Sequence, residues 1–180
     1  MLDDPASCVV THFVCAMRDA FKPDRSDGNS PIGGGSDTVR IFGGEALPLA
    51  YFTAHTKHPK CGCNVPFLWV RAGRRYKTKV FPTPYVGDTA CDLPWALEIQ
   101  IGVGRCAVIG LKTSWEDYER EADINLDDGN HLAWALCWAR QLIANDRECE
   151  ISGAMAIDSI TPIGPEGGII AQAATAYVQL

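Results

Sequence analysis

The chain lacks long hydrophobic runs, and none approaches the roughly 18 residues that a membrane-spanning helix needs. Its first residues, Met1 to Pro5, are acidic in character and lack the basic segment that opens a signal peptide. We therefore expect synthesis and folding in a cytoplasm. Positive charge is also scarce, because 22 acidic residues outnumber 16 lysines and arginines and leave a net charge of −6. This balance disfavours general affinity for DNA, although basic clusters can still form locally.

Motifs of catalysis and of nucleotide binding are missing as well. The sequence contains no G-x-S-x-G elbow and no H-E-x-x-H helix. The glycines 33–35 are not followed by the Gly-Lys-Ser/Thr that grips a phosphate. The segment 102–107 fits G-x-G-x-x-G/A, but strand-like residues follow it instead of the helix that would bind a pyrophosphate. These absences predict a protein that is not an enzyme and carries no cofactor.

Cysteine, in contrast, is abundant, with eight residues in the chain. Eight cysteines would suggest disulfides in a secreted protein, but nothing in this sequence signals secretion. Cys8, Cys15 and Cys137 occupy apolar helical positions, which is typical of cysteine as a small buried hydrophobe. His12 lies among apolar neighbours too, and such a histidine is usually packed and hydrogen-bonded.

A second group of cysteines and histidines lies between residues 55 and 106. Zinc usually takes two tight ligand pairs such as C-x2-C, whereas Cys61-Gly62-Cys63 is C-x-C and has no matching pair. We therefore expect a local disulfide or free thiols here, and no metal. The weak candidates for metal ligands in this region are His58, Cys61, Cys63 and Cys91.

The length of 180 residues predicts a single domain spanning 1–180. Asp4 and Pro5 form a helix start, and apolar residues at i+4 spacing predict a helix over about 5–21. The turn-forming segment 22–37 predicts a flexible loop.

Most of the remaining chain has strand character. Alternation is clearest over 95–103, where Trp95, Leu97, Ile99, Ile101 and Val103 face one side. Other predicted strands are 38–42, a hairpin of 67–71 with 76–81, and a C-terminal pair of 151–160 and 169–180 joined by a glycine- and proline-rich loop over 161–168. Together these elements predict an α+β fold with a mixed, mainly antiparallel sheet.

One long helix interrupts the strands. An apolar stripe that includes Leu132 and Leu136 predicts a helix over about 127–145, preceded by a solvated acidic stretch over 116–128. Trp134 and Trp138 lie on another flank of this helix. They either fill a second part of the core or form a contact between subunits.

Basic residues gather on the predicted hairpin. They belong either to a solvated strand pair with protected edges or to a surface that meets an acidic partner or lines a channel for DNA. The residues concerned are Arg71, Arg74, Arg75, Lys77 and Lys79.

The order of these elements resembles that of the tail terminator proteins of long-tailed bacteriophages, in particular those from neck-gene clusters of phages that infect actinobacteria. The resemblance rests on Cys61-Gly62-Cys63, on Leu68-Trp69-Val70-Arg71, on the segment from Ala96 to Ala107, and on Thr161 to Gly168. The triple glycine at 33–35 and the histidine-rich segment 55–58 depart from the pattern.

The resemblance implies a structural virion protein of the head–tail neck that assembles in the host cytoplasm. Such subunits form a ring, expected to be a hexamer, that caps the tail tube, stops its polymerisation and joins the tail to the head-completion or stopper protein. Genomic DNA would pass through the lumen without specific recognition, and no membrane partner is expected. The residues we expect at subunit or partner contacts are Trp134, Trp138, Pro162, Gly164, Pro165, Arg71, Arg74 and Arg75.

Two alternatives remain open at this point. Another neck component, a stopper or adaptor, would share the location and the symmetry, but a stopper is expected to be a small β-barrel, which the long helix disfavours. The second alternative is not a structural protein but a small zinc- or thiol-dependent enzyme, whose active site would be formed by the cysteines and histidines of residues 55–106.

Overall fold

The structure is a computed structural model that describes residues 4–25, 28–44, 49–57, 62–110, 112–147, 149 and 151–180. Its α-helices are α1 (Pro5–Ala20), α2 (Leu49–Lys57) and α3 (Trp115–Asn145), and two short 3-10 turns are η1 (Gly62–Asn64) and η2 (Ala90–Asp92). Its strands are β1 (Val39–Gly43), β2 (Phe67–Val80), β3 (Thr83–Pro84), β4 (Trp95–Cys106), β5 (Met155–Glu166) and β6 (Ile169–Gln179).

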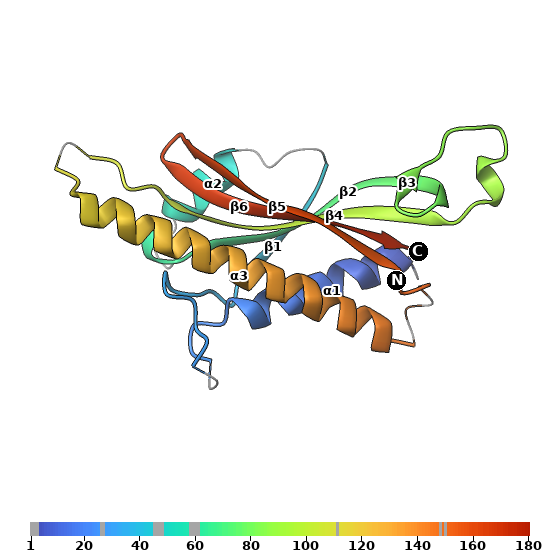
Figure 1. Cartoon of the computed structure of the whole chain (residues 1–180), viewed down its shortest axis with the longest axis horizontal. Helices are drawn as coiled ribbons and strands as arrows, with labels where there is room; N and C mark the ends of the chain where they lie inside the picture. Colours follow the sequence, from blue (N-terminus) through green and yellow to red (C-terminus); the bar gives the residue numbers. More distant parts are fainter. Residues whose placement is uncertain are drawn as a thin grey trace.

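The strands form one mixed sheet in the order β1-β2-β4-β6-β5, with β3 paired to β2 (Figure 1). β1 runs parallel to β2, and the other neighbours are antiparallel. The expected fold is confirmed, with a mainly antiparallel sheet, an N-terminal helix, one long helix and a C-terminal hairpin. α1 and α3 lie together across one face of the sheet (Figure 1).

The N-terminal helix follows from its first residues. The Asp4 carboxylate accepts a hydrogen bond from the backbone N–H of Ala6 at 3.1 Å, and Pro5 occupies the first helical position. Val9, Phe13 and Met17 are fully buried against the sheet. The prediction of a helix over 5–21 is therefore confirmed to within one residue.

Strand β4 carries the alternation that its sequence predicts. Leu97, Ile99, Ile101 and Val103 all point into the main core, while Trp95 at the end of the strand is half-exposed. The dinucleotide-like segment does not open a helix, because β4 continues through it to Cys106.

The predicted hairpin of 67–71 and 76–81 is wrong. Residues 67–80 form one strand, in which the pairing with β4 shifts register between Ala72 and Arg75. A β-bulge accommodates extra residues without reversing the chain. The interruption of the apolar alternation between the two predicted strands is therefore due to a β-bulge and not to a turn.

The predicted start of the long helix is also wrong. α3 begins at Trp115, and its 31 residues include the acidic stretch expected to precede it. Ser114 and Asp117 form a reciprocal capping box, and Glu116 and Asp117 lie at the positive end of the helix dipole. The helix therefore begins 12 residues upstream of the predicted start at about 127, and acidic side chains are favourable in its first turn.

The predicted loop over 161–168 belongs largely to a strand. β5 continues to Glu166, and only Gly167 and Gly168, both with positive φ, remain between β5 and β6. Pro162 and Pro165 are tolerated because β5 is an edge strand, where a missing N–H does not break an interior ladder.

The core lies mainly between the sheet and the two long helices. Helix α3 contributes Leu132, Leu136, Ala139 and Ile143 to this core, in agreement with the predicted apolar stripe. A smaller cluster on the opposite face, under α2, consists of Phe52, Phe67, Trp69, Ala171 and Ala173. Gly102 has no side chain to collide with Trp69, since a Cβ there would lie 2.1 Å from the indole.

A buried ion pair anchors the segment predicted as a loop over 22–37. Arg105 donates two hydrogen bonds to the Asp128 carboxylate, at 2.6 and 2.7 Å, and two more to the carbonyl oxygens of Gly33 and Gly34. Burial raises the pKa of Asp128, and the Arg105 guanidinium opposes that rise. A Cβ on Gly35 would lie 2.2 Å from the carbonyl oxygen of Phe21, so close backbone approach explains the glycine at this position.

Candidate assembly interface

Two strands bound the sheet among the residues that the structure describes, β1 on one side and β5 on the other. Each presents one row of backbone N–H and C=O groups that no other described strand of the sheet covers. Such edges are templates for pairing with another chain unless charge, proline or a covering element protects them. The two edges differ in sequence, length and surroundings.

The β1 edge borders a groove between the sheet and α2. Ile41 is 60% exposed and Tyr51 is 47% exposed, and the Phe42 and Tyr51 rings are 4.7 Å apart. His55 is fixed by a 2.9 Å hydrogen bond to the carbonyl oxygen of Val65. The groove has a volume of about 510 Å³ and is lined by Val39, Arg40, Ile41, Phe42, Tyr51, Ala54, His55 and Phe67.

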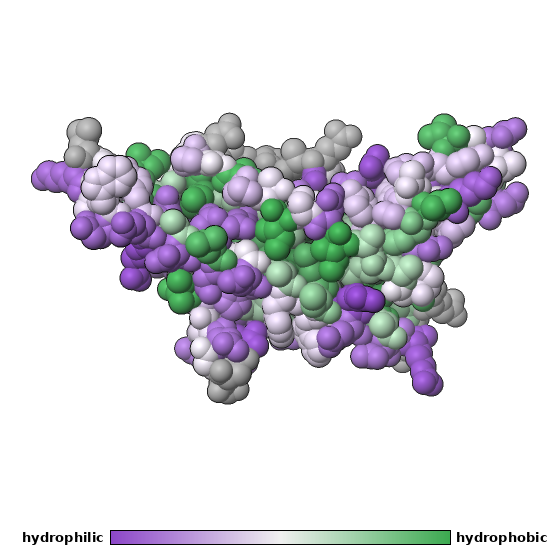
Figure 2. Space-filling view, in the orientation of Figure 1, coloured by the Kyte–Doolittle hydropathy of each residue, from purple (hydrophilic) through white to green (hydrophobic). Residues whose placement is uncertain are grey.

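The β5 edge is longer and has two unlike halves. Its second half contains Pro162 and Pro165, which have no N–H to donate to a neighbour. Residues 155–161 contain no proline, and a register shift between Ile157 and Ile160 interrupts their pairing with β6. Ile157 is 45% exposed and Ile163 is 43% exposed, so apolar side chains also line this edge. Figure 2 shows apolar surface in the middle of the molecule, where β5 lies beside α3.

The strand directions make the two edges compatible with each other. β1, β2 and β6 run in one direction, and β4 and β5 run in the opposite direction. β1 and β5 are therefore antiparallel to each other. A β5 edge of one copy beside a β1 edge of the next would continue the sheet in the antiparallel sense.

The two tryptophans of α3 form a stacked pair on its flank. Their ring centroids are 6.1 Å apart, and Trp134 remains 39% exposed. Arg25 lies over the Trp134 ring at 4.4 Å, and Trp138 Nε1 donates to Asp19 Oδ2 at 3.0 Å. Trp134 and Trp138 therefore already contact residues of the same subunit at and just after the C-terminal end of α1, namely Arg25 and Asp19.

The basic residues expected on a hairpin lie on the single strand β2. Arg71 is buried and donates to the carbonyl oxygen of Gly44 at 3.2 Å. Arg74 pairs with Glu98 at 2.9 Å, and Arg75 pairs with Asp4. These arginines are engaged within the subunit, and they do not form one uniform basic surface.

Proline and glycine residues expected at a contact, Pro162, Gly164 and Pro165, all lie on the exposed edge of β5. The structure therefore places them on the same edge as Ile157, whereas the tryptophan pair and Arg71 lie elsewhere.

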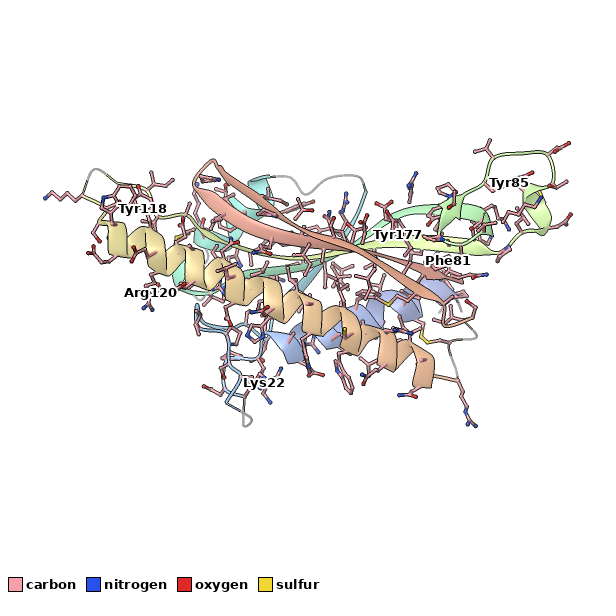
Figure 3. All side chains as sticks on the ribbon, viewed as in Figure 1. Lys22, Phe81, Tyr85, Tyr118, Arg120 and Tyr177 are labelled. Carbon is pink, nitrogen blue, oxygen red and sulfur yellow. A yellow bond between two sulfur atoms is a disulfide. The ribbon has the colours of Figure 1, made fainter. Side chains whose placement is uncertain are left out.

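The two ends of the molecule along its longest axis also carry apolar side chains. At one end, the Trp115 and Tyr118 rings are 6.2 Å apart, with Ile109 near the β5–β6 turn. At the other end, Val86, which follows β3 directly after Tyr85, is 96% exposed. Figure 3 shows Tyr118 at the beginning of α3 and Tyr85 at the opposite end of the molecule.

The cysteines of the 55–106 region are separated. Cys63 forms a disulfide bond with Cys106 at the end of β4, whereas Cys91 lies in η2, just before the start of the same strand. A 12-residue strand lies between them and spans about 40 Å. His58 and Cys61 lie outside the described residues. Cys137, which was expected to be buried, is exposed, because it lies on the flank of α3 that faces away from the sheet.

Sequence reasoning missed the β1–α2 groove. It predicted β1 but no helix over 49–57, although Pro48 directly before Leu49 is a common start signal. The helix is short and has weak amphipathic character, so periodicity alone did not identify it.

No protein-family model matches the chain, and no curated protein matches it. In the part of the chain that the structure describes, no helix has the length and apolar character to cross a membrane.

Proposed function

We propose that the protein is a structural subunit that assembles edge to edge into a closed ring, and that this ring is the tail terminator of a long-tailed bacteriophage neck. The observation that carries the proposal is the pair of unlike sheet edges, β1 and β5, which run in opposite directions and both expose apolar residues. Contacts between two different surfaces of identical copies generate rings when the rotation between copies closes.

The contact we propose pairs β1 with residues 155–161 of the next copy. The five residues of β1 are short enough to pair within the seven proline-free residues 155–161 of β5. Ile41 would cover apolar surface around Ile157, and the Arg40 guanidinium would approach the Asp158 carboxylate, since both charged side chains are exposed. The prolines after residue 161 end the pairing and thereby set its register.

The assignment to the neck comes from the resemblance of the element order and motifs to tail terminators. In that role the apolar side chains exposed at the two ends of the subunit are suited to axial contacts, one with the major tail tube protein and one with the stopper or head-completion protein. Genomic DNA would pass through the lumen without specific contacts.

Native mass spectrometry and negative-stain imaging of the same purified sample test the assembly. We expect a closed oligomer, six copies by the resemblance, with a central hole. A protein that stays monomeric both alone and in the presence of tail tubes would contradict the proposal.

A charge exchange tests the contact itself. Arg40→Asp and Asp158→Arg each place like charges across the proposed seam, so each should weaken the ring, whereas the double variant restores it. Matched controls are Arg140→Asp and Asp88→Arg, which reverse exposed charges away from both edges. If the double variant assembles no better than the single variants, the seam lies elsewhere.

The tryptophan flank is the competing contact. Alanine at Trp134 and Trp138 should leave the ring intact if the seam joins β1 and β5. Loss of the ring in a variant that still folds would favour the flank instead.

Binding to tail tubes separates a terminator from a stopper or adaptor. A terminator ring mixed with purified tubes should appear at one end of each tube and stop further polymerisation of the tube protein. A ring that binds only the head-completion protein would belong to another neck component.

A further inference from the structure

Four side chains with metal-binding atoms converge where the beginning of α1 meets the end of α3. Cys8 and His12 are four residues apart on one side of α1, Asp146 caps the C-terminus of α3, and Cys149 follows three residues later. One atom from each side chain lies within 4.8 Å of all the others. None of the four residues belongs to a strand of the sheet.

Three separations within the cluster, those of His12 Nε2 from both sulfur atoms and of Asp146 Oδ2 from Cys8 Sγ, lie in the range of a tetrahedral zinc site, and the other two from Asp146 Oδ2 are shorter. With Zn–S bonds of about 2.3 Å and Zn–N and Zn–O bonds of about 2.0–2.2 Å, ligand atoms lie about 3.3–3.8 Å apart. His12 Nε2 lies 3.6 Å from Cys8 Sγ and 3.4 Å from Cys149 Sγ. Asp146 Oδ2 lies 3.7 and 3.0 Å from the same two sulfur atoms, and 2.8 Å from His12 Nε2.

The two sulfur atoms are joined as a disulfide bond in the structure. His12 Nε2 and Asp146 Oδ2 are hydrogen-bonded at 2.8 Å, and the same oxygen lies 3.0 Å from Cys149 Sγ, which has no proton to donate when it is part of a disulfide. A cation between the electron-rich atoms accounts for all four side chains at once. The two sulfur atoms would then separate to about 3.8 Å, and Asp146 Oδ2 and His12 Nε2 would move apart to about 3.3 Å.

The ligand spacing is also that of a zinc site. Cys8-x3-His12 and Asp146-x2-Cys149 are two tight pairs, one on a helix and one at a helix end, and Cys149 is buried. Four protein ligands would leave no open position for a substrate, so a metal held here would be structural and not catalytic.

We propose that Cys8, His12, Asp146 and Cys149 bind one Zn²⁺ that fastens the first turns of α1 to the C-terminus of α3. The chain is synthesised with thiols, and binding releases one proton from each thiol to solvent without any transfer of electrons. The neutral imidazole and the Asp146 carboxylate complete the tetrahedron. The disulfide is the state that forms without the metal when a two-electron oxidant such as dioxygen takes two electrons and two protons from the same pair of thiols. This proposal does not depend on the proposed ring.

Elemental analysis of the full-length chain, purified under reducing conditions from zinc-supplemented cells, tests the site. We expect one zinc per chain, and replacement by Co²⁺ should give the intense visible absorption of a tetrahedral cobalt thiolate. Zinc content close to zero, with Cys8 linked to Cys149 in a peptide map of the same sample, would overturn the proposal.

Variants locate the metal. Cys149→Ser and His12→Gln should each reduce the bound zinc to a small fraction, whereas Cys137→Ser, which removes an exposed thiol outside the cluster, should retain it. If a cluster variant does not fold, the cobalt spectrum of the unaltered chain still decides the matter. Undiminished zinc in folded Cys149→Ser would place the metal elsewhere and overturn the assignment.

Discussion

The two faces of the sheet differ in what covers them. α1 and α3 lie across one face and bury the inward stripe of β4 completely, whereas α2 covers only one end of the other face. Away from α2, that second face is polar, and one row across three strands consists of Arg71, Gln100 and Thr175. The difference indicates that the helix-covered face supplies most of the stability and that the other face and the edges are available for contacts.

The largest expected difference in the free energy of unfolding is between two arginine variants, one on each face of the sheet. Arg105 is buried with Asp128, so Arg105→Ala leaves a buried carboxylate without its partner and should lower the free energy of unfolding by about 3–5 kcal/mol. Arg74, which pairs with Glu98 on the more exposed face, should cost about 0–1 kcal/mol when changed to alanine. Urea denaturation of both variants measures the difference. Equal losses would contradict the division between the faces.

Two isoleucines give the next comparison. Ile101 is fully buried, and Ile101→Ala should lower the free energy of unfolding by about 2–5 kcal/mol through lost contacts and the cavity left behind. Ile157 on the β5 edge is half-exposed, and its replacement by alanine should change the value by no more than about 0.5 kcal/mol. Denaturation is best measured under conditions that keep the protein monomeric. A large loss at Ile157 would show that the edge contributes to the core.

A pair of glycines tests the small cluster under α2. Gly102→Ala would bring a Cβ against the indole of Trp69, and we expect a loss of about 1–3 kcal/mol in the free energy of unfolding. Gly43 on β1 has open space where a Cβ would lie, so Gly43→Ala is the matched control and should be neutral or slightly stabilising. If Gly102→Ala is also neutral, then Trp69 shifts without cost and this face is loosely packed.

The smallest effect concerns the start of α1. Asp4→Ala removes the helix cap and should cost about 0.5–2 kcal/mol. The hydrogen bond from Arg75 holds the pKa of Asp4 below its ordinary value of 3.8, so the carboxylate stabilises the fold above that pH. This stabilisation is lost as the pH falls through the lowered pKa. The difference between Asp4→Ala and the unaltered protein should therefore shrink in acid, and a constant difference would contradict the assignment.

Much of the fold was predictable from local patterns. The i+4 spacing over 5–21 and the alternation over 95–103 each define one apolar face, and that information is contained in neighbouring residues. The errors came where local signals conflict. An interrupted alternation in β2 is compatible with a turn or with a bulge, and the acidic residues 116–128 are compatible with a solvated stretch or with the first turns of a helix.

The candidate interface was less predictable. Pro162, Gly164 and Pro165 were expected at a contact as loop residues, but their position on an edge strand follows from the strand order, which no single segment determines. Arg40 and Asp158 gave no signal, since an exposed charge has the same appearance in a sequence whether or not another copy faces it.

The sequence by itself determined which residues face inward on α1 and β4 and that the fold mixes helices with a mainly antiparallel sheet, because helical and strand periodicities are local properties. Only the tertiary structure decided which distant residues meet. Cys8 and Cys149 are separated by 141 positions, and Cys8 in its helix has the pattern of an ordinary buried residue. Its proximity to His12, Asp146 and Cys149 depends on how α1 packs against α3 over the shared core, and that packing is a property of the whole chain.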